Sequence, residues 1–284
     1  MKFIFLVFSL LISFLNFAYT QEATFTTQNQ TYVEFIRNVQ IHPNYQTDNA
    51  QILNPIIPLG QRVSLLLGFD QIDGEMGSYS FQILNCYADW TVSSLNPTEY
   101  LNQYNDFTIF DSEFSINTKV DYTHYSFEIP SVKLAGNYVV KVYQNGDEDD
   151  VVLTRRFMVY DETILVGARV ENVVGAEEAG RKQQVNFWVN YANINLTNPQ
   201  KQIQVVLRQN NRWDNAITDL EPTFIRAFDK RLEYNHFNLE NAFDGGNEFR
   251  MFDTRSLRPQ AWSVDSVFFG VNNDVAHLFQ EKIR

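Results

Sequence analysis

Charged and aromatic residues alternate in one stretch of this 284-residue chain, DGGNEFRMFDTRSLRPQAW, which runs from Asp244 to Trp262. Glu248 and Asp253 lie in it, and with Asp214 they could supply the acid and base of a glycoside hydrolase, which need a separation of roughly 5–10 Å. Arginines neighbour these carboxylates in the sequence: Arg212, Arg250 and Arg255. Because a nearby guanidinium keeps a carboxylate ionised, these acids are poorly prepared to donate a proton. The pattern favours ion pairs that tie loops to strands over catalysis.

Residue types that other reactions require are too dispersed to predict a site. The histidines stand far apart and form no HxH or HExxH pattern: His42, His124, His236 and His277. The single cysteine, Cys86, allows neither a zinc-ligand set nor an internal disulfide. Cys86 and His124 could form a nucleophile pair, but Cys86 lies in an alternating apolar run and is better explained as a buried thiol. We expect no enzymatic activity, no metal and no cofactor.

The aromatic residues that could stack on a sugar are the four tryptophans, Trp90, Trp188, Trp213 and Trp262. Trp188 lies within an apolar segment, VNFWVNY, and is predicted to be in the core. Trp90 and Trp213 end strand-like segments beside Asp and Asn, where a β-sandwich carries its binding residues. A tryptophan in that position also closes the end of a sandwich. We favour the closing role and keep ligand binding as the alternative.

Alternating β-rich segments, with little helical periodicity, must position these side chains. Seven segments are predicted as strands up to residue 160: Thr31–His42, Arg62–Asp70, Ser78–Tyr87, Phe107–Ile116, Asp121–Pro130, Gly136–Gln144 and Val151–Tyr160. Asn145-Gly146 is a hairpin signal. The four acids that follow it lack the ligand spacing of a calcium loop, so we interpret QNGDEDD as a solvated turn. Residues 31–160 are thus predicted to form an immunoglobulin-like or fibronectin-like sandwich.

A second strand-rich block covers residues 163–284, so the predicted fold class is all-β, with two tandem antiparallel sandwiches. Its expected strands are Thr163–Val173, Gln183–Ala192, Lys201–Asn210 and Asp265–Val271. Pro222–Tyr234 could be a bent strand or a short helix. The junction Val159–Thr163 has no Pro-rich or Gly-rich linker, so we expect the sandwiches to pack end to end with a limited hinge. We expect the second sandwich to be incomplete at its C-terminal side.

Residues 1–20 have the order of a cleaved secretory signal, with Lys2, an apolar run and then small residues at Ala18 and Thr20. The apolar run has 15 residues, whereas a membrane-spanning helix needs roughly 20. We therefore expect an exported, soluble chain that does not insert into a membrane, with a disordered segment over Gln21–Gln30. The net charge of −12 argues against nucleic acid and anionic membranes as partners.

Short motifs recur along the chain in an order that resembles one family. They are NCYADW (Asn85–Trp90), FSINT (Phe114–Thr118), YTHY (Tyr122–Tyr125), AGNYVVKVY (Ala135–Tyr143), TRRFMV (Thr154–Val159), QNNRWDNAI (Gln209–Ile217) and GGNEFRMFDTRSL (Gly245–Leu257). Their order resembles the plug protein of the Bacteroidota type IX secretion system and covers nearly all of the chain after the signal. The family often has His where this chain has Leu84, a small departure that leaves the fold expectation unchanged.

The resemblance implies a non-enzymatic β-sandwich protein of the periplasm. Such proteins bind the periplasmic opening of a large outer-membrane translocon β-barrel and close it when no substrate is in transit. The family has no catalytic residues to carry over. Loops with Asp, Asn, Arg and Trp suit a reversible, hydrated interface of this kind. The nominated partner-binding residues are Trp90, Arg212, Trp213, Asp214, Arg250 and Arg255.

Two other functions remain open from the residues themselves. One is a secreted carbohydrate-binding protein that uses Trp90 and Trp213 as stacking platforms. The other is a glycosidase or esterase whose site the sequence does not reveal. Retention on polysaccharide would favour the first, and turnover of chromogenic esters or glycosides would favour the second.

Overall fold

The computed structural model describes residues 25–45, 53–60, 63–173, 180–246, 252–253, 262–271 and 273–279. The predicted signal peptide lies outside these residues. Strands dominate the described chain, and its two helices, α2 (Pro97–Tyr100) and α3 (Pro199–Gln202), are single turns. Within these ranges, no helix has the length and apolar character needed to cross a membrane. The predicted all-β fold class, built from antiparallel sheets, is confirmed.

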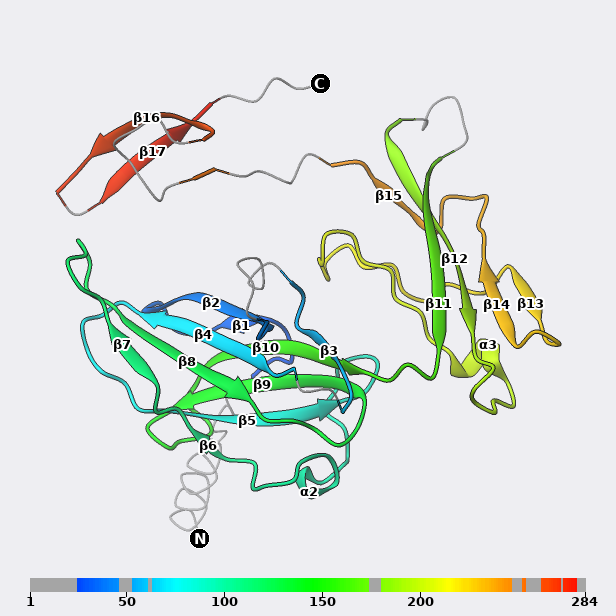
Figure 1. The fold of residues 1–284 in the computed structure, drawn as a ribbon, viewed down its shortest axis with the longest axis horizontal. Coiled ribbons are helices and arrows are strands. Elements are labelled where there is room, and N and C mark those ends of the chain that lie inside the picture. Colours follow the sequence, from blue (N-terminus) through cyan, green and yellow to red (C-terminus); the bar gives the residue numbers. More distant parts are fainter. Residues whose placement is uncertain are drawn as a thin grey trace, which may run out of the picture.

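The first unit consists of two layered sheets (Figure 1). One sheet has the order β1 (Gln30–Thr31), β10 (Val151–Tyr160), β9 (Gly136–Gln144), β5 (Tyr79–Cys86) and β6 (Phe107–Thr108). The short β3 (Ile56–Pro58) adds to this sheet in parallel with β10. The other sheet has the order β2 (Ile36–Pro43), β4 (Leu65–Gln71), β8 (Thr123–Ile129) and β7 (Ser112–Phe114).

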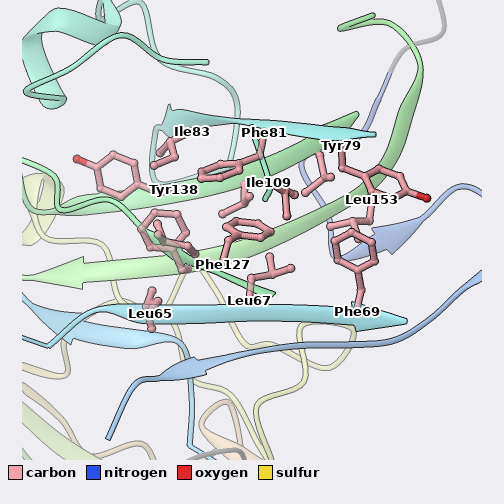
Figure 2. Close-up of a cluster of buried hydrophobic side chains, with 14 of the residues drawn as sticks. Leu65, Leu67, Phe69, Tyr79, Phe81, Ile83, Ile109, Phe127, Tyr138 and Leu153 are labelled. Atoms are coloured by element: carbon pink, nitrogen blue, oxygen red, sulfur yellow. The ribbon is translucent and has the colours of Figure 1, made fainter. Parts of the chain in front are cut away.

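The core of the first sandwich lies between these sheets, as Figure 2 shows. Leu65, Leu67 and Phe69 of β4 alternate toward Phe81 and its neighbours on β5, and all are nearly or fully buried. The alternation follows from the two-residue period of a strand, which sends every second side chain to the same face. Rings in the core stack closely: the centroids of Phe81 and Phe127, from opposite sheets, are 4.2 Å apart.

Most predicted strands of this unit are present, but two predicted segments divide between the sheets. The segment Phe107–Ile116 forms β6 in one sheet and β7 in the other. Between them Ile109 is buried in the core, and its backbone N–H donates to Tyr79 O at 2.9 Å. The segment Thr31–His42 divides in the same way into β1 and β2. Alternating sequence marks strand character, but it does not show where a chain changes sheets.

The β9–β10 hairpin has the predicted turn. Asn145 and Gly146 both have positive φ, at 57° and 71°, as the central residues of this kind of turn require. The turn opens a longer connection between the strands, whose base is closed by a 3.1 Å hydrogen bond from Gln144 N–H to Asp150 O. The backbone N–H of Asp147 closes the turn by donating to Gln144 O at 3.0 Å. The acidic residues after the turn are mostly exposed.

The expectation of disorder up to Gln30 is wrong for the described part of that segment. Phe25 lies under the ammonium of Lys141, 4.8 Å from Nζ to the ring centroid. Thr27 O accepts a 2.6 Å hydrogen bond from Arg156 Nε, and Gln28 O accepts one of 2.7 Å from the Thr154 hydroxyl. Specific side chains of the folded sandwich thus hold a polar segment that composition alone would leave disordered.

The second unit contains one five-stranded sheet in the order β11 (Leu165–Asn172), β12 (Lys182–Asn190), β14 (Arg231–Tyr234) and β13 (Phe224–Arg226), with β15 (Ala242–Asp244) also paired to β12. Phe187 and Tyr234 stack on its inner face with centroids 4.4 Å apart. Partly buried residues of the following chain, including Ile194, Ile203 and Leu220, pack against them.

Two strand predictions for this unit are corrected. Lys201–Asn210 is not a strand: α3 covers its start, and only the bridge of Leu207 with Ile217 is β-like. A proline in the first turn favours the helix. Pro222–Tyr234 is neither a helix nor one bent strand, but the hairpin β13–β14.

Trp188 lies on the outer face of the sheet rather than in the core. Its neighbours Phe187 and Val189 are buried, so strand alternation turns Trp188 outward. The indole lies against Gly167, where a Cβ would be only 2.4 Å from the ring. The guanidinium of Arg231 is 4.5 Å from the ring centroid.

A hairpin of β16 (Val264–Phe269) and β17 (Asp274–Leu278) lies on the β7 side of the first sandwich (Figure 1). Lys119 links the two, because its ammonium pairs with the Asp274 carboxylate and donates to Gly270 O at 2.8 Å. The described residues of the 163–284 block thus comprise the five-stranded sheet and this hairpin. Its organisation as a second sandwich stays a prediction.

Candidate functional site

The outer face of the β5–β9–β10 sheet is apolar where a solvated face would be polar. Ile83, Val140 and Phe157 point into the core, so alternation turns their neighbours outward: Leu84, Val139 and Met158. Val139 nonetheless has no exposed surface. A sheet that is buried on both faces needs other parts of the chain to cover each face. Residues of the second unit supply part of the cover on the outer face.

Trp90 occupies the centre of this outer face. It follows β5 in a tight turn, where its N–H donates to Tyr87 O at 3.0 Å. Its φ of 67° lies in the left-handed region, which is unfavourable for a bulky side chain. The side chain is only 5% exposed and packs against Cys86 and Val139. The burial of a large indole offsets the cost of the backbone conformation.

Trp213 reaches Trp90 from the second unit. Its loop is closed at its base by two 2.9 Å hydrogen bonds between Leu207 and Ile217, and in Figure 1 the loop extends toward the first sandwich. The two indoles meet edge to face, with centroids 5.1 Å apart and planes at 83°. This is a favourable geometry for aromatic pairs.

Two arginines stack on these rings. The Arg156 Cζ atom is 4.2 Å from the Trp90 centroid and 4.9 Å from that of Trp213. Arg208, from the second unit, places Cζ 4.3 Å from the Trp213 centroid. Partial burial lowers the pKa of both guanidinium groups, and the charge of Arg208 lowers that of Arg156 further. We call Trp90, Trp213, Arg156 and Arg208 the junction cluster.

The junction cluster and Val139, which packs against it, unite four of the motifs that carry the family resemblance. Trp90 ends NCYADW, Val139 lies in AGNYVVKVY, Arg156 lies in TRRFMV, and Trp213 lies in QNNRWDNAI. These segments are distant in sequence and meet only through the fold. The sequence nominated both tryptophans but missed Arg156 and Arg208. The apolar residues that β9 and β10 turn outward, Val139 and Met158, could have indicated that this face is covered.

Cys86 is confirmed as a buried thiol in the floor of this cluster. Burial raises the pKa of the Cys86 thiol to about 11, so it stays protonated near neutral pH. His124 is engaged elsewhere, with Nδ1 2.6 Å from Asp70 Oδ1. The arrangement gives no support to a Cys86–His124 nucleophile.

Arg212 and Asp214 form the predicted type of ion pair at the tip of the Trp213 loop. Arg212 Nε and Nη2 donate to the two carboxylate oxygens of Asp214 at 3.0 and 2.6 Å. These bonds lower the pKa of Asp214, which opposes a role as a general acid. Arg250, Arg255 and Glu248 lie outside the described residues.

Within the described ranges, no group of three or more His, Cys, Asp or Glu side chains is placed to hold a metal ion. The junction cluster itself consists of two aromatic rings and two cations. Such a set can hold two parts of a molecule together and attract an anion.

Known proteins support the resemblance. Residues 36–161, which form most of the first sandwich, match the family model described as "Type 9 secretion system plug protein 1st domain". A solved structure, entitled "Crystal structure of a hypothetical protein from Parabacteroides merdae ATCC 43184 at 2.30 A resolution", is 28% identical, with a TM-score of 0.80 over 90% of this chain. This chain spans 64% of that one. No curated protein matches. Through residues 36–161, its first sandwich, this chain is thus similar to the first domain of type 9 secretion system plug proteins.

Proposed function

We propose that this protein is a non-enzymatic plug that closes the periplasmic opening of the type IX outer-membrane translocon when no substrate is in transit. The family match of residues 36–161 carries this proposal. The sequence supports the location through its predicted signal peptide. An acidic, hydrated surface suits a partner that must be released again.

The physical demands on a plug agree with the junction cluster. A body that blocks a wide aqueous pore must resist deformation, and two units joined by a flexible linker alone would not. Here the edge-to-face tryptophans and the stacked arginines fix the second unit against the first. Trp90 and Trp213 therefore act in the proposed mechanism by holding the plug in shape.

Of the nominated partner-binding residues, Arg212 and Asp214 are the ones described as exposed. They lie in the loop that Trp213 anchors, so the junction fixes where this ion pair is presented. We propose that the pair contributes to the translocon contact. Arg250 and Arg255 belong to the same proposal, although they lie outside the described residues.

The carbohydrate-binding alternative loses its stacking platforms in this geometry. Trp90 is almost completely buried, Trp213 packs against it, and guanidinium groups cover both rings. A sugar ring would need a free indole face. We therefore advance no second function.

The test is a co-purification from the native host. The full-length protein is tagged and expressed there, the outer membrane is solubilised gently, and the bound proteins are identified. We expect a very large β-barrel in near-equal amount. Deletion of the gene should also let a large hydrophilic dye leak across the outer membrane. A protein that purifies without any barrel, with no leak after deletion, would refute the proposal.

The interface is tested by Arg212→Ala and Asp214→Ala, which should reduce the amount of co-purified barrel. Lys201→Ala is the matched control, because Lys201 is an exposed cation on α3 of the same unit. Thermal unfolding of each variant separates a lost contact from a lost fold. Equal recovery of the barrel with all three variants would remove this loop from the interface.

A further inference from the structure

The two arginines of the junction cluster line one cleft between the units. Its walls include Trp90, Trp213, Asn29 and Asn211, beside the apolar Ile56. Arg156 reaches the cleft from β10, and Arg208 reaches it from the second unit. Two cations thus face one opening, although the whole chain has a net charge of −12.

Neither arginine is neutralised by the described part of the chain. No carboxylate within the described ranges forms an ion pair with Arg156 or Arg208. Arg156 uses Nε to bond Thr27 O at 2.6 Å. The described residues supply no acceptor for its terminal N–H groups, nor for the guanidinium of Arg208.

The stacking leaves the terminal N–H groups of Arg156 and the donor edge of Arg208 available. A guanidinium donates in its own plane, so a ring against its face fixes its direction without occupying its donors. Burial lowers the pKa of Arg156, and the charge of Arg208 lowers it further. An anion between the two guanidinium groups would offset both effects. A planar fork fits the two oxygens of a carboxylate or phosphate.

We propose that this cleft is a binding site for an oxyanion, held between Arg156 and Arg208. The ligand chemistry is that of a carboxylate carried by a peptide or of free phosphate. Because each unit contributes one arginine, an occupied site ties the second unit to the first. The proposal does not rest on the plug function and stands whether or not a translocon binds.

The experiment is calorimetric titration of the mature chain at constant low salt. The probes are inorganic phosphate and an acetylated, amidated tetraglutamate peptide, with the equivalent tetraglutamine peptide as the neutral control. We expect saturable binding of phosphate or of tetraglutamate at a single site and none of tetraglutamine. Phosphate alone or tetraglutamate alone would each support the site and identify its source of anion.

Arg156→Gln and Arg208→Gln should each weaken binding by about tenfold or more, since a hydrogen bond to a charged group is worth that much. Arg169→Gln is the matched control: it makes the same change in the second unit, at an exposed side chain paired with Glu171 and outside the cleft lining, and should bind like wild type. Arg208→Lys keeps the charge but loses the fork, so it should bind with intermediate affinity. Circular dichroism verifies the fold of each variant.

Two outcomes would overturn the proposal. One is the absence of saturable binding of both anions to the wild-type chain, a result that depends on no variant. The other is wild-type affinity in folded Arg156→Gln and Arg208→Gln. Neither outcome bears on the plug function, which is tested separately by co-purification.

Discussion

Trp90 combines an unfavourable backbone with nearly complete burial. A left-handed φ costs a residue with a side chain about 1–2 kcal/mol, and Trp90 adopts one at 67°. The burial of Trp90 and its contacts with Trp213 and Arg156 recover more than this cost, because a large aromatic surface leaves water and the ring stacks with a cation. At the residue scale, Trp90 is therefore the member of the junction on which the others depend.

Replacement of Trp90 by Ala should lower the free energy of unfolding by about 3–5 kcal/mol, the usual cost of removing a buried large aromatic side chain. Equilibrium unfolding in urea measures this loss of free energy. Trp262→Ala is the control, because Trp262 is 61% exposed, and a surface substitution costs within about 0.5 kcal/mol. Equal losses in the two variants would contradict the role assigned to Trp90.

The β9–β10 hairpin shows how an element depends on its turn. β9 and β10 pair along almost their whole length, and both faces of β9 are covered. Both turn residues have positive φ, and the turn that they form reverses the chain directly after β9. At Gly146 a Cβ would meet no atom within 4 Å, so its requirement is purely conformational.

Gly146→Ala should therefore destabilise the protein by about 1–2 kcal/mol through backbone strain alone. Chemical denaturation gives the value. Glu148→Ala, two residues away on an exposed side chain, should change stability by less than about 0.5 kcal/mol. An unchanged midpoint for Gly146→Ala would mean that the turn relaxes into another type.

At the scale of the whole molecule, long-range contacts hold the parts together. The junction cluster joins the five-stranded sheet to the first sandwich, and Lys119 joins the β16–β17 hairpin to it. These contacts differ in kind. The first is largely apolar and buried, whereas the second is an exposed ion pair, which contributes only about 0–1 kcal/mol.

Lys119→Ala should speed hydrogen exchange in β16 and β17 and leave the global unfolding midpoint almost unchanged. Mass spectrometry of peptides from residues 264–279 measures the exchange. Asp265→Ala is the control, because this carboxylate lies on the hairpin but makes no described contact with the first sandwich. Slow exchange in Lys119→Ala would show that other contacts hold the hairpin.

The sequence by itself determined strand character and turn position, and its motifs indicated the resemblance that the match of residues 36–161 supports. Alternation in segments such as Ser78–Tyr87 and the Asn145-Gly146 signal are local properties, since the period of a strand and the φ of a turn need no distant partner. The charge pattern around Asp214 also predicted its pairing with an arginine. Trp90 and Trp213 were recognisable from the sequence as aromatic residues at strand ends. Their role in joining the two units was not predictable from it.

Only the tertiary structure decided which residues face each other. It divided Phe107–Ile116 between two sheets, turned Trp188 outward and ordered the segment from Phe25 to Gln30. It also brought Arg156 to Arg208 across the junction of the two units. Such contacts join residues far apart in the chain, and their free energy comes from burial and stacking that exist only after both units have folded. No local pattern carries that information.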